Sequence, residues 1–264
     1  MKISPVARQR RHTLHFLAEL DSQVPVYLDT EVDMSRVLRH RDGGRRYSVV
    51  TYVLRAAGEA LTVHPEANVA LHGRRVARFD AVHGKVTFDK TVDGERVVVS
   101  GLVRDLHTAA LDDVQRGVER YRDGSPESMP EFAPMRLLHR MPRPLGRLMF
   151  RLGVRPLSRR ADVMGTVAVT SLGHRPVDSF HSLGGTTVTL GVGRITDRPV
   201  VRDGAVTIAP VMRLSMAFDH RAIDGALAAD VLAEVKDVLE NHPVDQQAGH
   251  AGHNGHLTRN EAAR

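Results

Sequence analysis

The sequence of 264 residues contains no cysteine and no tryptophan. Without cysteine, the chain has no disulfide framework, no thiolate-bound zinc or iron–sulfur cluster, and no cysteine nucleophile. Aromatic residues make up only 4% of the chain, which argues against a protein that binds single-stranded nucleic acid by stacking bases. Any chemistry therefore depends on histidine, hydroxyl, carboxyl and guanidinium groups.

Long apolar runs are also missing. No stretch approaches the roughly 18 apolar residues of a membrane span, and Met1 to Leu20 lacks the apolar core of a secretory signal. We therefore expect no transmembrane segment and a cytoplasmic location. The net charge is +6, which favours anionic partners such as nucleic acid, acidic lipid or a phosphate-bearing cofactor. The sequence carries no helix-turn-helix, zinc-finger or RNA-binding signature, so we expect no nucleic acid.

Apolar periodicity predicts alternating helices and strands. Helices are expected over residues 5–20, 48–63 (with Ser48 as N-cap), 108–121 and 225–239, and strands over 24–32, 86–88, 96–103, 166–170, 186–192 and 211–218. Pro25 would place the first strand at a sheet edge or at a strand start. Asp93-Gly94 predicts a hairpin turn.

The stretch 132–161 contains eight arginines and no acidic residue. Its prolines predict several short helices. Three interpretations stand: a solvated basic face, a lid over an anionic ligand, or an attachment to a membrane surface or protein partner. The polar tail 246–264 contains several histidines, and we expect it to be disordered, with no physiological metal role.

The strongest chemical signal is Phe218-Asp-His-Arg-Ala-Ile-Asp-Gly225, between a predicted strand and a predicted helix. His220 would lie at a strand end, where a rigid scaffold positions catalytic groups, and histidine is a residue type that can take or give a proton near neutral pH. Asp224 lies four residues further on, close enough to orient the loop or to pair with an arginine. The structural alternative is that Asp224 caps the helix and His220 is a turn residue. Spacing alone leaves both interpretations open.

This motif resembles the catalytic signature of the acyltransferase (E2) domain of 2-oxo acid dehydrogenase complexes, which shares its fold with chloramphenicol acetyltransferase. Four further segments are similar to the family's in the same order, over about residues 5–242: His64-Pro-Glu-Ala-Asn68, Asp93–Val99 with Arg104-Asp105, Gly165-Thr-Val-Ala-Val-Thr-Ser-Leu-Gly173, and Leu190-Gly-Val-Gly193. The resemblance implies an α/β fold of the chloramphenicol acetyltransferase type, with a mixed β-sheet flanked by helices.

The resemblance also implies a mechanism. The histidine matching His220 is the family's general base, and it removes the proton of a thiol of coenzyme A or dihydrolipoamide. A hydroxyl stabilises the oxyanion, which by register is Thr170, with Ser171 as the neighbouring alternative. The carboxylate matching Asp224 holds the loop and the histidine in place. Coenzyme A is then a substrate, a lipoyl group acts in trans, and no metal is needed.

The resemblance further implies a homotrimer or larger assembly whose site lies between subunits, with a lipoyl-bearing protein or dehydrogenase subunits as partners. We expect an acyltransferase domain over residues 1–245, including 132–161 as an arginine-rich amphipathic insertion, and standing alone without lipoyl or subunit-binding domains. The competing hypothesis is a trimeric scaffold of the same fold that has lost its activity. Residues that bind a cofactor are not identified from the sequence.

Overall fold

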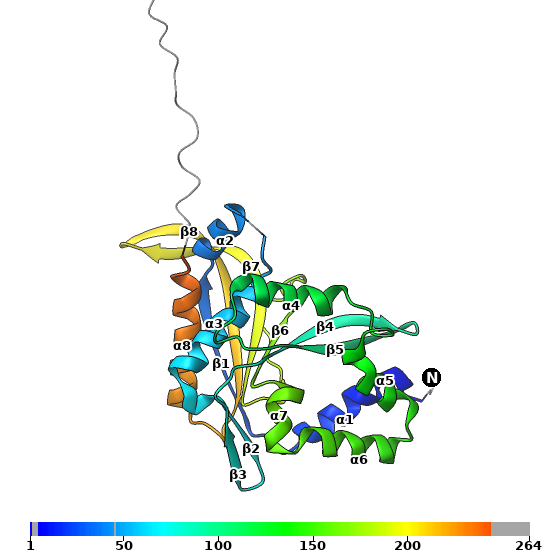
Figure 1. Cartoon of the computed structure of the whole chain (residues 1–264). Coiled ribbons are helices and arrows are strands. Elements are labelled where there is room, and N and C mark those ends of the chain that lie inside the picture. The colour runs from blue at the N-terminus through cyan, green and yellow to red at the C-terminus, as the bar shows by residue number, and fades with distance from the viewer. Residues whose placement is uncertain (2–4, 45, 244–264) are drawn as a thin grey trace, which may run out of the picture.

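A six-stranded mixed sheet forms the centre of the computed structural model, which describes residues 1, 5–44 and 46–243. The strand order is β1-β8-β7-β6-β4-β5, and β6 pairs in parallel with β4 and β7 while the other pairs are antiparallel. The strands are β1 (Pro25–Asp33), β4 (Gly84–Val92), β5 (Glu95–Val103), β6 (Val167–Ser171), β7 (Val188–Arg202) and β8 (Ala205–Asp219). The predicted mixed sheet with flanking helices is confirmed (Figure 1).

Helices α3 and α8 cover one face of the sheet and pack against each other (Figure 1). The helices are α1 (Arg11–Leu20), α2 (Ser35–Asp42), α3 (Val49–Val63), α4 (Leu111–Asp123), α5 (Ala133–Arg140), α6 (Arg143–Val154), α7 (Leu157–Met164) and α8 (Gly225–Glu240). Three short 3₁₀ helices are described as well: η1 (Arg8–Arg10), η2 (Pro65–Ala67) and η3 (Pro130–Phe132). The main core lies between these two helices and the sheet.

Local sequence explains where several elements begin and end. The side chain of Ser48 accepts a hydrogen bond from the backbone of Thr51, so it caps α3 as predicted. Between β4 and β5, Asp93 and Gly94 have φ of 48° and 79°. These are the left-handed conformations that a two-residue hairpin turn requires. Pro25 begins β1, which is an edge strand, so the missing amide of that proline breaks no central ladder.

The arginine-rich stretch forms α5, α6 and α7, separated at Pro142 and Pro156 as predicted. These helices join α1, which packs against α5 and α6, in a group beside the sheet and away from α8 (Figure 1). Helix α6 turns Gly146 and Val154 inward. A row of its apolar side chains remains exposed: Leu145, Leu148, Met149 and Leu152.

Some elements differ from the expectation. Helix α4 begins at Leu111 rather than at residue 108, because the amides of Thr108 and Ala109 donate to the carbonyl of Asp105 in a preceding turn. Strands β7 and β8 extend into a long ribbon with exposed valines and an isoleucine, so burial periodicity gives no signal there. Helix α2 and the β2 (Val69–His72) and β3 (Arg75–Arg78) hairpin were not predicted.

The expected tail, 246–264, lies outside the described residues. Within the described part of the chain, no helix is long and apolar enough to cross a membrane. The same residues contain no cluster of three or more potential metal ligands.

Candidate active site

His220 follows the last residue of β8 and is held by the backbone around it. Its amide donates to the carbonyl of Val24 at 2.9 Å. Its ring lies against that of Phe218, with centroids 5.6 Å apart. The side chain is 44% exposed, so the imidazole is fixed at its base and reaches solvent at its tip. Among the described residues, no hydrogen-bond partner occupies Nε2.

Asp224 faces the other nitrogen of this ring. One carboxylate oxygen lies 3.5 Å from Nδ1 of His220, and the Asp224 side chain is 90% exposed. That separation exceeds a normal hydrogen bond, so the two groups are neighbours in a loose pair. Asp224 also occupies the N-cap position of α8, but its side chain accepts no hydrogen bond from the helix. Among the described residues, Asp224 therefore lies beside His220 and not in an ion pair with an arginine, and its side chain does not cap the helix.

Asp219 anchors the turn from inside. It is 5% exposed, and its carboxylate accepts from the guanidinium of Arg221 at 2.9 and 2.5 Å and from the Arg221 amide at 3.2 Å. Burial alone would raise the pKa of Asp219, but the hydrogen bonds from Arg221 outweigh it and the pKa is lowered. The turn that carries His220 is thus fastened by an ionised carboxylate. Sequence analysis did not assign this role to Asp219 or Arg221.

Thr170 lies near the end of β6, beside Thr87 of β4. The hydroxyl of Thr87 donates to the hydroxyl of Thr170 at 3.0 Å. A hydroxyl carries one proton and two acceptor sites, so the proton of Thr170 remains available to a ligand. The alternative, Ser171, accepts from the amide of Gly173 at 3.3 Å, which holds its oxygen in a local turn.

A cavity of about 1070 Å³ opens at this end of the sheet. Thr87, Thr170 and Ser171 line it, and so do basic groups from four elements and a loop: Arg10, Lys90, Arg96, Arg122 and Arg175. Its size suits a ligand larger than a simple acyl group. Thr170, the hydroxyl that the resemblance indicated, therefore lines a cavity that is large enough for a substrate.

His220 and Thr170 do not meet within one chain. Thr170 pairs with Gly191, which pairs with Ser215, whereas His220 follows β8 five residues beyond Ser215. At about 3.3 Å per residue, this offset is about 16 Å along the strand. Two strand spacings separate them further across the sheet. The imidazole and the hydroxyl thus lie toward opposite ends of the sheet.

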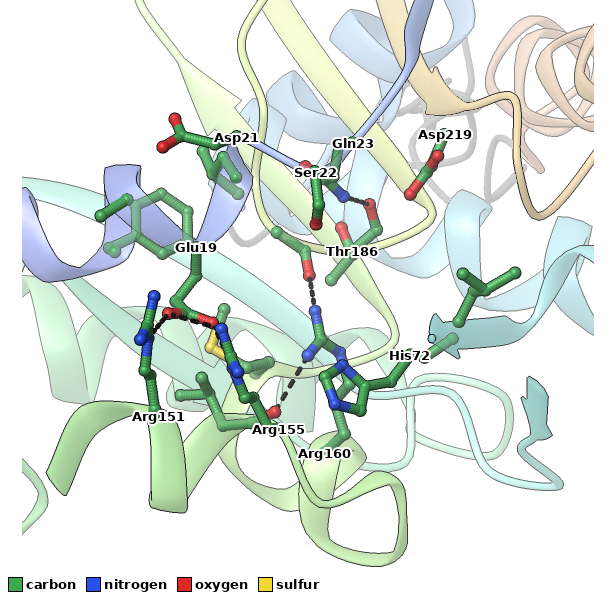
Figure 2. A pocket seen from close by; sticks show the side chains of 18 of the residues that line it. Glu19, Asp21, Ser22, Gln23, His72, Arg151, Arg155, Arg160, Thr186 and Asp219 are labelled. Carbon is green, nitrogen blue, oxygen red and sulfur yellow. Dashed lines mark hydrogen bonds and ion pairs between the residues drawn. The ribbon is translucent and has the colours of Figure 1, made fainter. Parts of the chain in front are cut away.

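A second cavity, of about 290 Å³, lies beside the turn that carries His220. It is lined by α1, α6 and α7, and also by Asp219 and Arg221. Figure 2 shows Glu19 between Arg151 and Arg155, whose Nε atoms lie 2.7 and 2.8 Å from its carboxylate oxygens. The arginine-rich segment therefore forms the wall of a pocket, in addition to presenting a face to solvent.

Solved structures of known proteins share this architecture. A probable dihydrolipoamide acetyltransferase from Listeria monocytogenes superposes with a TM-score of 0.70 at 18% identity, over 94% of this chain and 98% of that one. A chloramphenicol acetyltransferase superposes with a TM-score of 0.52 at 16% identity, over 90% and 98% of the two chains. The fold is thus of the chloramphenicol acetyltransferase type, which confirms the predicted class.

Sequence comparisons narrow this class. Residues 158–244 match the family described as 2-oxoacid dehydrogenases acyltransferase (catalytic domain). The succinyltransferase component of the 2-oxoglutarate dehydrogenase complex of Pseudomonas aeruginosa is 24% identical over 248 residues, or 90% of this chain and 54% of that protein. The acetyltransferase component of the pyruvate dehydrogenase complex of Staphylococcus aureus is 48% identical over 52 residues, 20% of this chain and 12% of that one.

Over residues 158–244 the chain matches the catalytic domain of the 2-oxoacid dehydrogenase acyltransferases (E2), the same family that its motifs resemble. It spans about half the length of the Pseudomonas relative. The activity, the substrates and the assembly are therefore argued from the site itself.

Proposed function

We propose that this domain transfers an acyl group between a coenzyme A or lipoyl thioester and a thiol, with His220 as general base and Thr170 as oxyanion donor. The observation that carries the proposal is the pair of unengaged groups. The Nε2 atom of His220 and the hydroxyl proton of Thr170 have no partner among the described residues, although both belong to well-fixed elements.

The chemistry requires only proton transfer and charge stabilisation. Nε2 of His220 takes the proton of the attacking thiol, and the thiolate adds to the thioester carbonyl. The hydroxyl of Thr170 donates to the oxyanion of the tetrahedral intermediate. Collapse breaks the original carbon–sulfur bond, and the departing thiolate takes the proton back from His220. A positioned base contributes about 10²–10⁴-fold, and an oxyanion donor contributes about 10²–10³-fold.

The distance between His220 and Thr170 supports a site completed by two copies of the chain. The end of the sheet that carries His220 on one copy would meet the cavity containing Thr170 on the next. A similar catalytic chain, of TM-score 0.65 at 21% identity, forms the cubic core of a pyruvate dehydrogenase complex. This likeness is consistent with a homotrimer or a larger assembly here.

A related enzyme supports the residue assignment. In the dihydrolipoamide acetyltransferase of Azotobacter vinelandii, a serine, a histidine and an asparagine were investigated for their roles in catalysis. That asparagine follows the histidine by four positions, as Asp224 follows His220 in this chain. Thr170 would supply the hydroxyl that serine supplies there.

The test is thiol release from a panel of acyl-CoA esters, with dihydrolipoamide as acceptor, for wild type and His220→Ala. We expect turnover in the wild type and a loss of about 10²–10⁴-fold in the variant. Circular dichroism and light scattering verify that both proteins are folded and have the same mass. Unchanged turnover in a folded His220→Ala protein contradicts the proposal, and silence of the wild type across the panel favours an inactive scaffold.

A further inference from the structure

The cavity beside the His220 turn contains more positive than negative charge. Five arginines line its 290 Å³, and only three carboxylates do: Arg147, Arg151, Arg155, Arg160 and Arg221 against Glu19, Asp21 and Asp219. The lining of the cavity therefore carries a net positive charge, which favours an anionic ligand.

Two of these guanidiniums form no ion pair with a carboxylate of the described residues. Glu19 is shared by Arg151 and Arg155, and Asp219 is taken by Arg221. Arg160 donates only to two backbone carbonyls, of Val154 at 2.9 Å and of Gly185 at 3.0 Å (Figure 2). Arg147 has no carboxylate partner among the described residues. Both of these arginines retain their charge for a ligand.

The buried residue Lys85 lies behind the lining of the cavity and adds to its positive charge. Lys85 is 5% exposed, donates to the carbonyl of Gly184, and places Nζ 4.6 Å from the ring centre of Phe16, which lines the cavity. No carboxylate contacts it among the described residues. Burial, and then the charge of Arg160, lower the pKa of Lys85 to about 7. Burial also lowers the pKa of Arg160.

We infer that this cavity binds a phosphate group, held by Arg147 and Arg160 and supported by the charge of Lys85. A phosphate dianion matches the two guanidiniums without carboxylate partners, and guanidiniums recognise phosphate through paired hydrogen bonds. The volume suits a phosphate-sized group rather than a whole nucleotide cofactor. The phosphate comes either from coenzyme A, in which case the inference rests on the proposed function, or from a free oxyanion.

The location gives the site a consequence for the reaction. Asp219 and Arg221 line the cavity and flank His220 in sequence. A phosphate bound there would hold its molecule next to the turn that carries the base. The arginine-rich segment, which the sequence left with three interpretations, would then act as the wall of an anion site.

Arg147→Gln tests the inference, with Arg143→Gln as the matched control. Both residues are exposed arginines on α6, four positions apart, but only Arg147 lines the cavity. Titration calorimetry would measure binding of coenzyme A, 3′-dephospho-coenzyme A and inorganic sulfate. We expect Arg147→Gln to weaken anion binding about tenfold, the scale of one hydrogen bond to a charged group, and Arg143→Gln to change it less than about twofold.

The three ligands separate the two sources of phosphate. If coenzyme A supplies the 3′-phosphate, Arg147→Gln weakens coenzyme A but leaves dephospho-coenzyme A unchanged. If the site serves a free oxyanion, Arg147→Gln weakens sulfate and leaves both coenzymes unchanged. Equal affinities of the Arg147→Gln and Arg143→Gln proteins for all three ligands would overturn the inference.

Proton uptake gives a second measurement that does not depend on the arginine variants. Sulfate does not titrate near pH 7, so any proton taken up on its binding comes from the protein. We expect uptake as the bound anion favours the charged form of Lys85, and we expect Lys85→Met to abolish that uptake. Sulfate binding without proton uptake in the wild type would show that Lys85 does not contribute to the site. Sulfate binding is independent of acyl transfer, so failure of the proposed activity and failure of this site are distinguishable.

Discussion

The hydroxyl of Thr87 donates to the hydroxyl of Thr170 across the β4–β6 pair, at 3.0 Å. The two residues are 83 positions apart in the chain. The contact orients the Thr170 oxygen and directs its remaining proton away from β4. Thr87 is thus a positioning residue for the proposed oxyanion donor.

Thr87→Val should therefore lower kcat about three- to tenfold with little change in KM, because Thr170 keeps its hydroxyl but loses its orientation. Thr170→Val should cost about 10²–10³-fold, since the donor itself is lost. Thr13 lines the same cavity, so Thr13→Val is the matched control. Steady-state kinetics with the preferred acyl-CoA measure all three. A Thr87→Val protein with wild-type kcat would show that the contact is only structural.

Asp224 should tolerate an amide. The carboxylate approaches Nδ1 of His220 at 3.5 Å and is almost fully exposed, so it contributes orientation more than charge. We expect Asp224→Asn to stay within about threefold of wild-type kcat, and Asp224→Ala to fall about tenfold. Equal losses in both variants would indicate that the negative charge is what matters.

The two-copy site predicts complementation. His220→Ala and Thr170→Val should each be inactive alone. If the two are unfolded together and refolded as mixed assemblies, a site is intact only where His220 and Thr170 come from different variants. In a cyclic assembly this gives about a quarter of wild-type activity. No recovery in mixed assemblies of confirmed size would place both groups of one site on one chain.

Lys85 should make stability depend on pH. In the unfolded chain its pKa is 10.5, and in the folded chain about 7. Between these values the unfolded state binds more protons, so stability rises with pH. The penalty is complete below pH 7 and disappears above pH 10.5.

Lys85→Met removes this penalty. The free energy of unfolding of the variant should exceed that of wild type by roughly 4 kcal/mol at pH 7, less about 1 kcal/mol for the lost hydrogen bond to Gly184. The difference should shrink towards pH 10. Urea unfolding at several pH values measures it. A difference that does not change with pH would mean that Lys85 titrates normally in the folded protein.

Gly58 should not accept a side chain, whereas Gly153 should. A Cβ on Gly58 of α3 would lie 2.6 Å from the carbonyl oxygen of Leu106, and a Cβ on Gly153 of α6 meets nothing within 4 Å. Gly58→Ala should destabilise the fold by about 1–3 kcal/mol, and Gly153→Ala should stabilise it by about 0.5–1 kcal/mol. Thermal and urea unfolding of the pair test this. Similar effects from both substitutions would contradict the packing of α3 on the segment that follows β5.

Strong local signals made much of the fold predictable. The alternating residues of β8 and the apolar stripe of α8 are buried as the periodicity indicated, so the motif between them was placed correctly. The Asp93-Gly94 turn likewise fixed the β4–β5 hairpin, because its backbone conformation suits those residues.

Features that depend on strand order were not predictable. The contact between Thr87 and Thr170 arises because β4 pairs with β6 rather than only with its hairpin partner. Lys85 lies near the start of β4, and its contacts come from distant parts of the chain, from Phe16 of α1 and from the loop at Gly184. The arginine pocket likewise needs α1 and α6 to meet, although more than 120 residues separate Glu19 from Arg151.

The separation of His220 from Thr170 has a consequence for control. Under the proposed mechanism the catalytic unit is the contact between copies, so a monomer would be folded but silent. Turnover per chain would then rise steeply with protein concentration and level off once assembly is complete. The protein concentration would then set both the number of active sites and the fraction of chains that are active. A change in the rate of protein synthesis would therefore change the activity more than in proportion.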